Sequence, residues 1–155
     1  MKKLILILSI TLLFFSCYKS EIEPLFSTSP EERVSERLAE LQNTLVGGTN
    51  GFKGVLTTSL GGGYSFYMKF KDDNTLEMLS DINTTTSTTV KVSTYRTKWL
   101  MDASLIFDTY NYISLLQDPG VKVPNSGGTS GNGLQSDVEF EYLNSSQDSV
   151  FFTGK

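Results

Sequence analysis

Apolar residues first recur with a helical period over residues 30–46. They are spaced by four, three and four positions and so fall on one face of a helix: Val34, Leu38, Leu41 and Leu45. The start is marked by Ser29-Pro30-Glu31-Glu32, a serine cap followed by proline and by a glutamate three residues after the cap. The pattern predicts an amphipathic helix that lies on a sheet. A helix that binds a partner is the alternative.

From Gly51 onward the period changes to alternation, which is typical of strands joined by Gly, Asn and Asp turns. We expect a first strand over 52–60. The clearest strand follows the glycines at 61–63, and its apolar residues share one face: Tyr64, Phe66, Met68 and Phe70. The turn Asp72-Asp73-Asn74 and the apolar run 76–79 then predict one hairpin over 63–80.

The threonine-rich residues 84–89 are expected to lead into a strand that contains Val90, Val92, Tyr95 and Trp99, with a disordered threonine run as the alternative. Residues 105–108 read as a short strand or turn. Residues 109–116 favour a short helix over an extended strand.

The glycine-rich residues 125–133 predict a long mobile loop. Residues 137–142 alternate acidic and apolar, and 150–152 form the last apolar run. The expected fold is mainly β (α+β), an antiparallel sheet, sandwich or partial barrel with one N-terminal amphipathic helix.

A different pattern occupies residues 1–17. Lys2 and Lys3 precede an apolar run over 4–15, and Ser16 stands before Cys17, the only cysteine. This is the layout of a secretory signal, and its end resembles the lipobox of bacterial lipoproteins. The resemblance implies cleavage before Cys17 and acylation of its thiol. About a dozen apolar residues are too few to cross a bilayer, which takes roughly 20.

These patterns divide the chain into a lipoprotein signal peptide over 1–16, a flexible tether over 17–29 and a single β-rich domain over 30–155. Because the last strand has no evident closing partner, we expect a C-terminal truncation. Without Lys2 and Lys3 the chain has 11 basic and 17 acidic residues, a net charge of −6. Nucleic acid is a poor partner for that charge. The absence of histidine excludes Ser-His-Asp and Cys-His nucleophiles from this segment.

Several segments together resemble a known family: the lipobox, SPEER at 29–33, the hairpin sequence at 61–81, STYRTKWL at 93–100, LIFDTYNY at 105–112 and SDVEFEY at 136–142. The family is a domain-of-unknown-function family of Bacteroidetes outer-membrane lipoproteins, encoded beside SusC/SusD-type nutrient-uptake systems. The resemblance implies localisation at the outer membrane, on its periplasmic face or at the cell surface. Family members are longer, which implies that this chain is an N-terminal portion.

Three groups of residues are candidates for function. Alternation places Tyr67 opposite the Phe66/Met68 face, so we hypothesise that Tyr67, Trp99 and Tyr95 line an exposed surface for a glycan or peptide. Asp72 and Asp73 offer oxygen ligands to calcium, but a plain turn is the favoured reading. The carboxylates of Asp137, Glu139 and Glu141 share a strand face, where solvated charges are more common than catalysis.

The sequence favours a non-enzymatic accessory or ligand-binding lipoprotein of an outer-membrane nutrient-uptake system, with importer subunits as partners. It predicts no cofactor and no catalytic residue. A cell-envelope hydrolase whose active site lies in a missing C-terminal part is one alternative. A structural or adhesion lipoprotein is the other.

Overall fold

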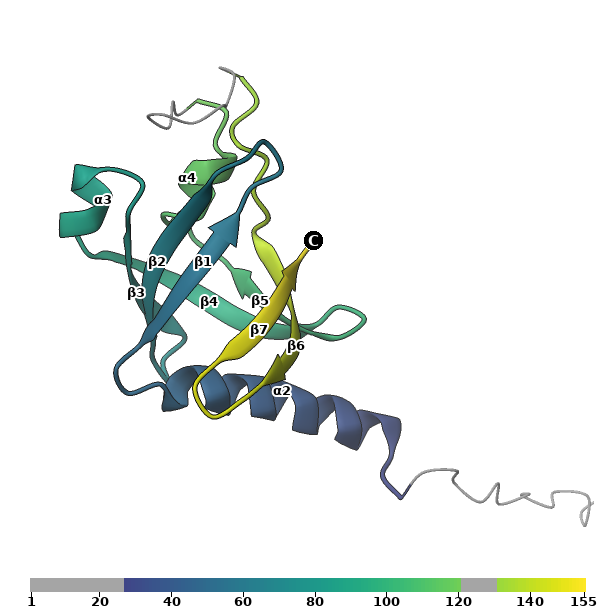
Figure 1. Ribbon diagram of the computed structural model, residues 1–155. Helices are drawn as coiled ribbons and strands as arrows, with labels where there is room; N and C mark the ends of the chain where they lie inside the picture. Colours follow the sequence, from purple (N-terminus) through teal and green to yellow (C-terminus); the bar gives the residue numbers. More distant parts are fainter. Residues whose placement is uncertain (1–26, 121–130) are drawn as a thin grey trace, which may run out of the picture.

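Seven antiparallel strands follow one another in space in the same order as in the sequence, β1 to β7, and form one curled sheet (Figure 1). The computed structural model describes residues 27–120 and 131–155. The strands are β1 (Phe52–Thr57), β2 (Gly63–Phe70), β3 (Thr75–Ser80), β4 (Lys91–Trp99), β5 (Ala103–Phe107), β6 (Glu139–Ser145) and β7 (Val150–Gly154). The curl makes a half-barrel, and the prediction of a mainly β fold is confirmed.

Helix α2 (Pro30–Gly47) lies across one end of the curled sheet (Figure 1). The predicted capping box is present, because the Glu32 amide donates to Ser29 Oγ at 3.2 Å and the Ser29 amide donates to Glu32 Oε2 at 2.8 Å. Leu41 and Leu45 are buried against the sheet. The predicted helix on a sheet is confirmed. Over the residues described, no helix is long and apolar enough to cross a membrane.

Strand β4 belongs to two parts of the sheet. Its beginning pairs with β3, with Lys91 opposite Met78, and its end pairs with β5, with Trp99 opposite Ala103. We call β1–β3 with the start of β4 the first half, and the end of β4 with β5–β7 the second half. The sheet bends along this shared strand.

The inner faces of both halves form one core with α2. Phe70 meets Tyr95 edge-on, with ring centroids 4.9 Å apart, and Phe107 meets Phe140 at 6.0 Å. The alternation in β2 and β3 is as predicted, since Phe66, Phe70, Leu76 and Met78 are buried. The predicted hairpin over 63–80 is therefore confirmed.

The threonine-rich segment is a helix, α3 (Thr84–Thr88), and neither the expected strand lead-in nor a disordered run. Asn83 Oδ1 accepts from the Thr86 amide, and Thr86 Oγ1 accepts from the Asn83 amide, both at 3.0 Å. The Thr86 hydroxyl also donates to the Ser80 carbonyl at 3.0 Å and is buried. Capping and one buried hydroxyl outweigh the preference of threonine for strands.

Other boundaries differ from the predictions by a few residues. Strand β1 ends at Thr57, not at 60, because Thr58–Gly62 form the turn. The helix expected over 109–116 is only α4 (Ser114–Gln117), since Asn111 Oδ1 accepts from the Ile113 and Ser114 amides just before it. Residues 105–107 of the predicted strand or turn belong to β5, which begins at Ala103, and Asp108 follows the end of this strand. Most of the predicted loop 125–133 lies outside the described residues.

Candidate functional site

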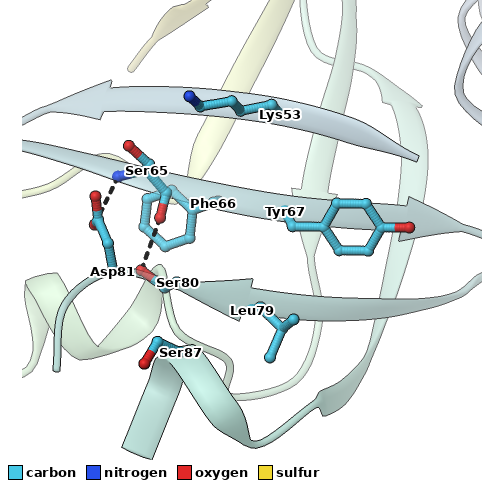
Figure 2. Close-up of a pocket in the computed structure, with 8 residues that line it drawn as sticks. All are labelled: Lys53, Ser65, Phe66, Tyr67, Leu79, Ser80, Asp81 and Ser87. Carbon is cyan, nitrogen blue, oxygen red and sulfur yellow. Dashed lines mark hydrogen bonds between the residues drawn. The ribbon is translucent and has the colours of Figure 1, made fainter. Parts of the chain in front are cut away.

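A shallow, open hollow of about 310 Å³ lies on the outer face of the first half (Figure 2). Strands β1, β2 and β3 form its floor and α3 forms one wall. Its lining comprises Lys53, Ser65, Phe66, Tyr67, Leu79, Ser80, Asp81 and Ser87. Its place follows from alternation, which turns odd-numbered residues of these strands away from the core.

Tyr67 is the aromatic side chain of this outer face. Its residue pairs with Lys53 on one side and Leu79 on the other, and it is 38 % exposed. Figure 2 shows the ring extended along β2, away from Ser65 and with its hydroxyl outermost. That hydroxyl donates to the Asn50 carbonyl at 3.1 Å. The ring is thus held in one orientation with apolar surface exposed.

Gly51 makes this orientation possible. Its φ is +73°, and a Cβ added there would lie 2.7 Å from the Tyr67 hydroxyl oxygen and 2.8 Å from the Met68 carbonyl oxygen. Only glycine combines this backbone conformation with so close an approach of the ring. The Tyr67 ring therefore rests on the backbone of the loop before β1.

The opposite end of the hollow is polar. Asp81 Oδ1 accepts from the Ser65 amide at 2.8 Å, and Ser80 Oγ donates to the Ser65 carbonyl at 3.0 Å (Figure 2). Ser87 lies on α3, and its hydroxyl donates to the Thr84 carbonyl at 3.0 Å, which leaves its oxygen able to accept. Burial, and secondly the charge of Asp81, raises the pKa of nearby Tyr64. A flat apolar surface and a polar end therefore occupy one hollow.

The hollow has the chemistry of a binding surface. An aromatic ring packs on the apolar face of a sugar or on a peptide, while lysine, carboxylate and hydroxyl groups at its edge supply hydrogen bonds. Over residues 27–120 and 131–155, no three His, Cys, Asp or Glu residues gather where they could hold a metal ion. The Ser80 and Ser87 hydroxyls of the hollow donate to backbone carbonyls, and not to a side-chain base of the kind that activates a nucleophile in covalent catalysis.

Tyr95 does not lie on the surface that the sequence suggested. It is 1 % exposed, and its hydroxyl donates to the Lys71 carbonyl at 2.8 Å and accepts from Gln42 Nε2 at 3.0 Å. Burial raises the pKa of Tyr95, and the hydrogen bond from Gln42 partly opposes that shift. Tyr95 is a core residue that fastens α2 to the β2–β3 turn.

Trp99 is 39 % exposed but is remote from Tyr67. Met68, next to Tyr67, pairs with Met78, which pairs with Lys91 at the start of β4. Trp99 ends that strand, eight residues further along it. At roughly 3.3 Å per residue, eight residues span about 26 Å. The structure therefore does not bring the two aromatic residues into one site.

Asp72 and Asp73 lie in the β2–β3 turn. Asp73 Oδ1 accepts from the Thr75 hydroxyl at 2.6 Å and from the Thr75 amide at 2.9 Å. These two hydrogen bonds lower the pKa of Asp73. Asn74 completes the turn with a φ of 62°. One carboxylate oxygen is thus engaged in shaping a turn, as the favoured reading expects.

The three acidic residues near β6 do not act as a unit. Asp137 precedes the strand, which begins at Glu139. Glu141 pairs with Lys155, with Oε2 and Nζ 3.1 Å apart, and both side chains are 29 % exposed. A salt-bridged carboxylate on a half-exposed face lacks the contrast of environments that acid–base catalysis uses.

Sequence reasoning missed Lys53, Asp81 and Ser87. Alternation alone places Lys53 and Tyr67 on outer faces, but the register that makes them neighbours needs the structure. Ser87 reaches the hollow only because residues 84–88 form a helix, which was predicted wrongly. Cys17, the predicted lipidation site, lies outside the described residues.

Comparisons with curated proteins and with solved structures give no match. One family matches residues 22–155, which include every strand and helix described above. Its description is a domain of unknown function, DUF4302. The chain belongs to this family.

Proposed function

We propose that this protein is a lipid-anchored lipoprotein of the outer membrane that serves as an accessory or ligand-binding component of a nutrient-uptake assembly of the SusC/SusD kind. The observation that carries the proposal is Cys17. It ends a leader with two lysines and an apolar run, and it stands 13 residues before Pro30, where α2 begins. Acyl chains on its thiol would hold the folded domain at a bilayer surface without a spanning helix.

The hollow around Tyr67 supports the ligand-binding part of the proposal. The Tyr67 ring is fixed by a hydrogen bond to the Asn50 carbonyl and by close approach to Gly51, so little side-chain entropy is lost when a ligand stacks on it. Lys53, Asp81 and Ser87 stand at the edge of the same hollow. This arrangement favours a sugar ring that stacks on Tyr67 and forms hydrogen bonds at its rim. An extended peptide is the other ligand that such a surface accepts.

Mass spectrometry of protein from membranes tests the anchor. The expected product lacks residues 1–16 and carries acyl chains on Cys17, while Cys17→Ser keeps its leader and is not acylated. An unmodified Cys17 thiol in the wild-type protein would contradict the proposal. Detergent extraction followed by pull-down tests the assembly, and recovery without importer subunits would contradict the accessory role.

Binding to panels of oligosaccharides and peptides tests the hollow. Tyr67→Ala is expected to weaken binding by roughly tenfold, the change that a loss of about 1.4 kcal/mol of contact produces. Val92→Ala is the matched control, since Val92 is also an exposed outer-face residue, at 60 %, but does not line the hollow. Equal affinity of the wild type and the Tyr67 variant would contradict binding at this site.

A further inference from the structure

Exposed apolar side chains gather at the end of the second half, away from the hollow. Met101, at the tip of the β4–β5 hairpin, is 93 % exposed, and Trp99 and Leu143 are exposed by 39 % and 47 %. We call these three residues the hairpin rim. Arg37 connects the β4–β5 turn to β6, because its guanidinium lies 3.7 Å from the Asp102 carboxylate and donates to the Leu143 carbonyl at 2.6 Å.

The conformation of Met101 is unusual for its side chain. Its φ is 86°, in the left-handed region that favours glycine. The turn around it is closed by the Leu100 amide, which donates to the Asp102 carbonyl at 2.9 Å, and by the Ala103 amide, which donates to Asp102 Oδ1 at 2.7 Å. A methionine held at a costly backbone position, with almost no contact to the fold, points to a use outside it.

The hairpin rim lies at the end of the domain where α2 begins. Arg37, which contacts the rim, is seven residues from Pro30, about 10 Å along a helix. Cys17 stands 13 positions before Pro30, and even a fully extended chain of that length reaches at most about 45 Å. In Figure 1 the β4–β5 loop projects from the body on the side where α2 starts. A lipid on Cys17 would therefore attach the domain to the bilayer through the end that carries the rim.

The chemistry of the rim suits the boundary between headgroups and acyl chains. Tryptophan is enriched at membrane interfaces, where its ring is in an apolar layer and its N–H meets water. Methionine and leucine add apolar surface. Lys98 precedes Trp99 and adds an exposed cationic side chain, whereas Lys155, whose Nζ donates to the Leu100 carbonyl at 3.0 Å, is already paired with Glu141. A side chain such as that of Lys98 pairs with lipid phosphates while the rim enters the interface.

We propose that the hairpin rim inserts into the headgroup region of the bilayer that holds the Cys17 lipid. This inference rests on the proposed function, because a single short loop binds a membrane too weakly without a lipid anchor. With the anchor, the rim becomes a second contact that fixes the orientation of the domain. The hollow around Tyr67, far along the sheet, is then held away from the lipid.

Trp99 is the only tryptophan of the chain, so its fluorescence reports on the rim directly. The full acylated protein is reconstituted into phosphatidylethanolamine vesicles that contain phosphatidylcholine with brominated chains. The expected result is a blue-shifted emission that bromine quenches by roughly half, because an interfacial indole lies within reach of the acyl chains. Unshifted, unquenched emission would overturn the proposal.

Variants at exposed positions separate membrane contact from folding. Met101→Glu is expected to remove most of the quenching, since a carboxylate at the tip resists entry into the interface. Val92→Glu, at an exposed valine at the opposite end of β4, is expected to leave the quenching unchanged. Met101→Gly relieves the left-handed backbone, so it is expected to lose quenching while its thermal midpoint does not fall. Full quenching in both Met101 variants would contradict insertion of the hairpin rim into the bilayer.

Mass spectrometry of Cys17 in the same sample distinguishes this proposal from the anchor. Acylated protein in which Trp99 is exposed to solvent contradicts the insertion of the rim but supports the lipid anchor at Cys17. A rim that is quenched only weakly in vesicles, but cross-links through residue 101 to a protein in native membranes, overturns lipid contact in favour of a protein partner. Quenched emission that Met101→Glu abolishes supports the proposal.

Discussion

The two halves of the sheet share one core but differ on their outer faces. On the first half, Val55 and Val92 are 70 % and 60 % exposed, and Tyr67 stands over an open hollow. On the second half, β5 is buried on both faces, because its outer-face residues Ser104 and Ile106 are buried like its inner-face residues. The outer face of the curled sheet is therefore covered along β5 and exposed to solvent along β1–β3.

Charged side chains border the buried outer face of the second half. Ile106 pairs with Arg96 and Glu139, and Arg96 Nε lies 3.2 Å from Asp108 Oδ1. Lys155 lies over Ser104 and pairs with Glu141. The long stems of such residues cover apolar surface while their charged ends stay in water. Within the described part of the chain, the first half has no comparable cover over Tyr67, and that is the basis for proposing a ligand there.

The largest expected effect on stability tests whether the outer face of β5 is buried and that of β1–β3 is exposed. Ile106→Ala is expected to lower the free energy of unfolding by about 3 kcal/mol, because it removes a buried side chain and leaves a cavity. Val55→Ala, on the exposed outer face, is expected to change it by less than about 0.5 kcal/mol. Urea denaturation of both variants checks the difference. Similar losses in the two variants would show that the faces do not differ as described.

Gly51 gives the next largest effect. Gly51→Ala is expected to cost about 2 kcal/mol, since alanine is strained at a φ of +73° and its methyl group would meet the Tyr67 hydroxyl. Gly61→Ala is the control, because Gly61 has a φ of +92° but nothing within 4 Å of an added Cβ. Its cost is expected to be about 1 kcal/mol. The Gly51 variant alone should also lose ligand binding, which titration measures.

Tyr142 ties the second half of the sheet to α2 through a hydrogen bond. Its hydroxyl donates to Glu40 Oε1 at 2.7 Å and lies 2.9 Å from Ser145 Oγ, and Arg37 lies over its ring. Tyr142→Phe is expected to lower stability by about 1 kcal/mol at neutral pH, the usual value of a hydrogen bond to a partly exposed group. Thermal unfolding of the variant and the wild type measures the loss.

The same pair gives a pH dependence. The hydrogen bond from Tyr142, together with Arg37, lowers the pKa of Glu40 from 4.5. A carboxylate with a lowered pKa in the folded state stabilises the protein above its unfolded pKa, and that contribution is lost as the pH falls through the folded pKa. Tyr142→Phe should therefore flatten the loss of stability below about pH 4.5. An unchanged acid profile would exclude this role for Tyr142.

The smallest effect concerns the cover of the second half. Lys155→Gln removes the ion pair with Glu141, in which both side chains are partly exposed. The expected loss is within about 0.5 kcal/mol at low salt, because water and salt screen such pairs. The difference from the wild type should shrink further in high salt. A large, salt-insensitive loss would mean that Lys155 covers Ser104 mainly by packing.

Local patterns predicted the elements whose partners lie nearby in the sequence. The α2 start follows from Ser29, Pro30 and Glu32, and the β2–β3 hairpin follows from strict alternation around an Asp-Asn turn. Both were confirmed because the capping and the turn depend on adjacent residues. Helix α3 was missed although its Asn83 cap is also local, because threonine favours strands and the hydrogen bond from the buried Thr86 hydroxyl to Ser80 forms only when the segment packs on β3.

The inner and outer faces of β4 could not be assigned from the sequence. Val90 and Val92 are exposed, while Ser93 and Tyr95 point inward. What decides the orientation is α2, which covers Tyr95 and supplies Gln42 to its hydroxyl. Such long-range contacts carry no local signal, so the core position of Tyr95 and the shape of the hollow had to come from the structure.

The position of α2 has a consequence for how the protein is made. The helix comes first in the folded part of the chain, but Leu41 and Leu45 pack where β4 and β5 complete the core. Synthesis reaches those strands only after three others and α3. During synthesis the apolar stripe of the helix stays uncovered until the β4–β5 hairpin emerges, which makes it the natural recognition site for a chaperone at that stage.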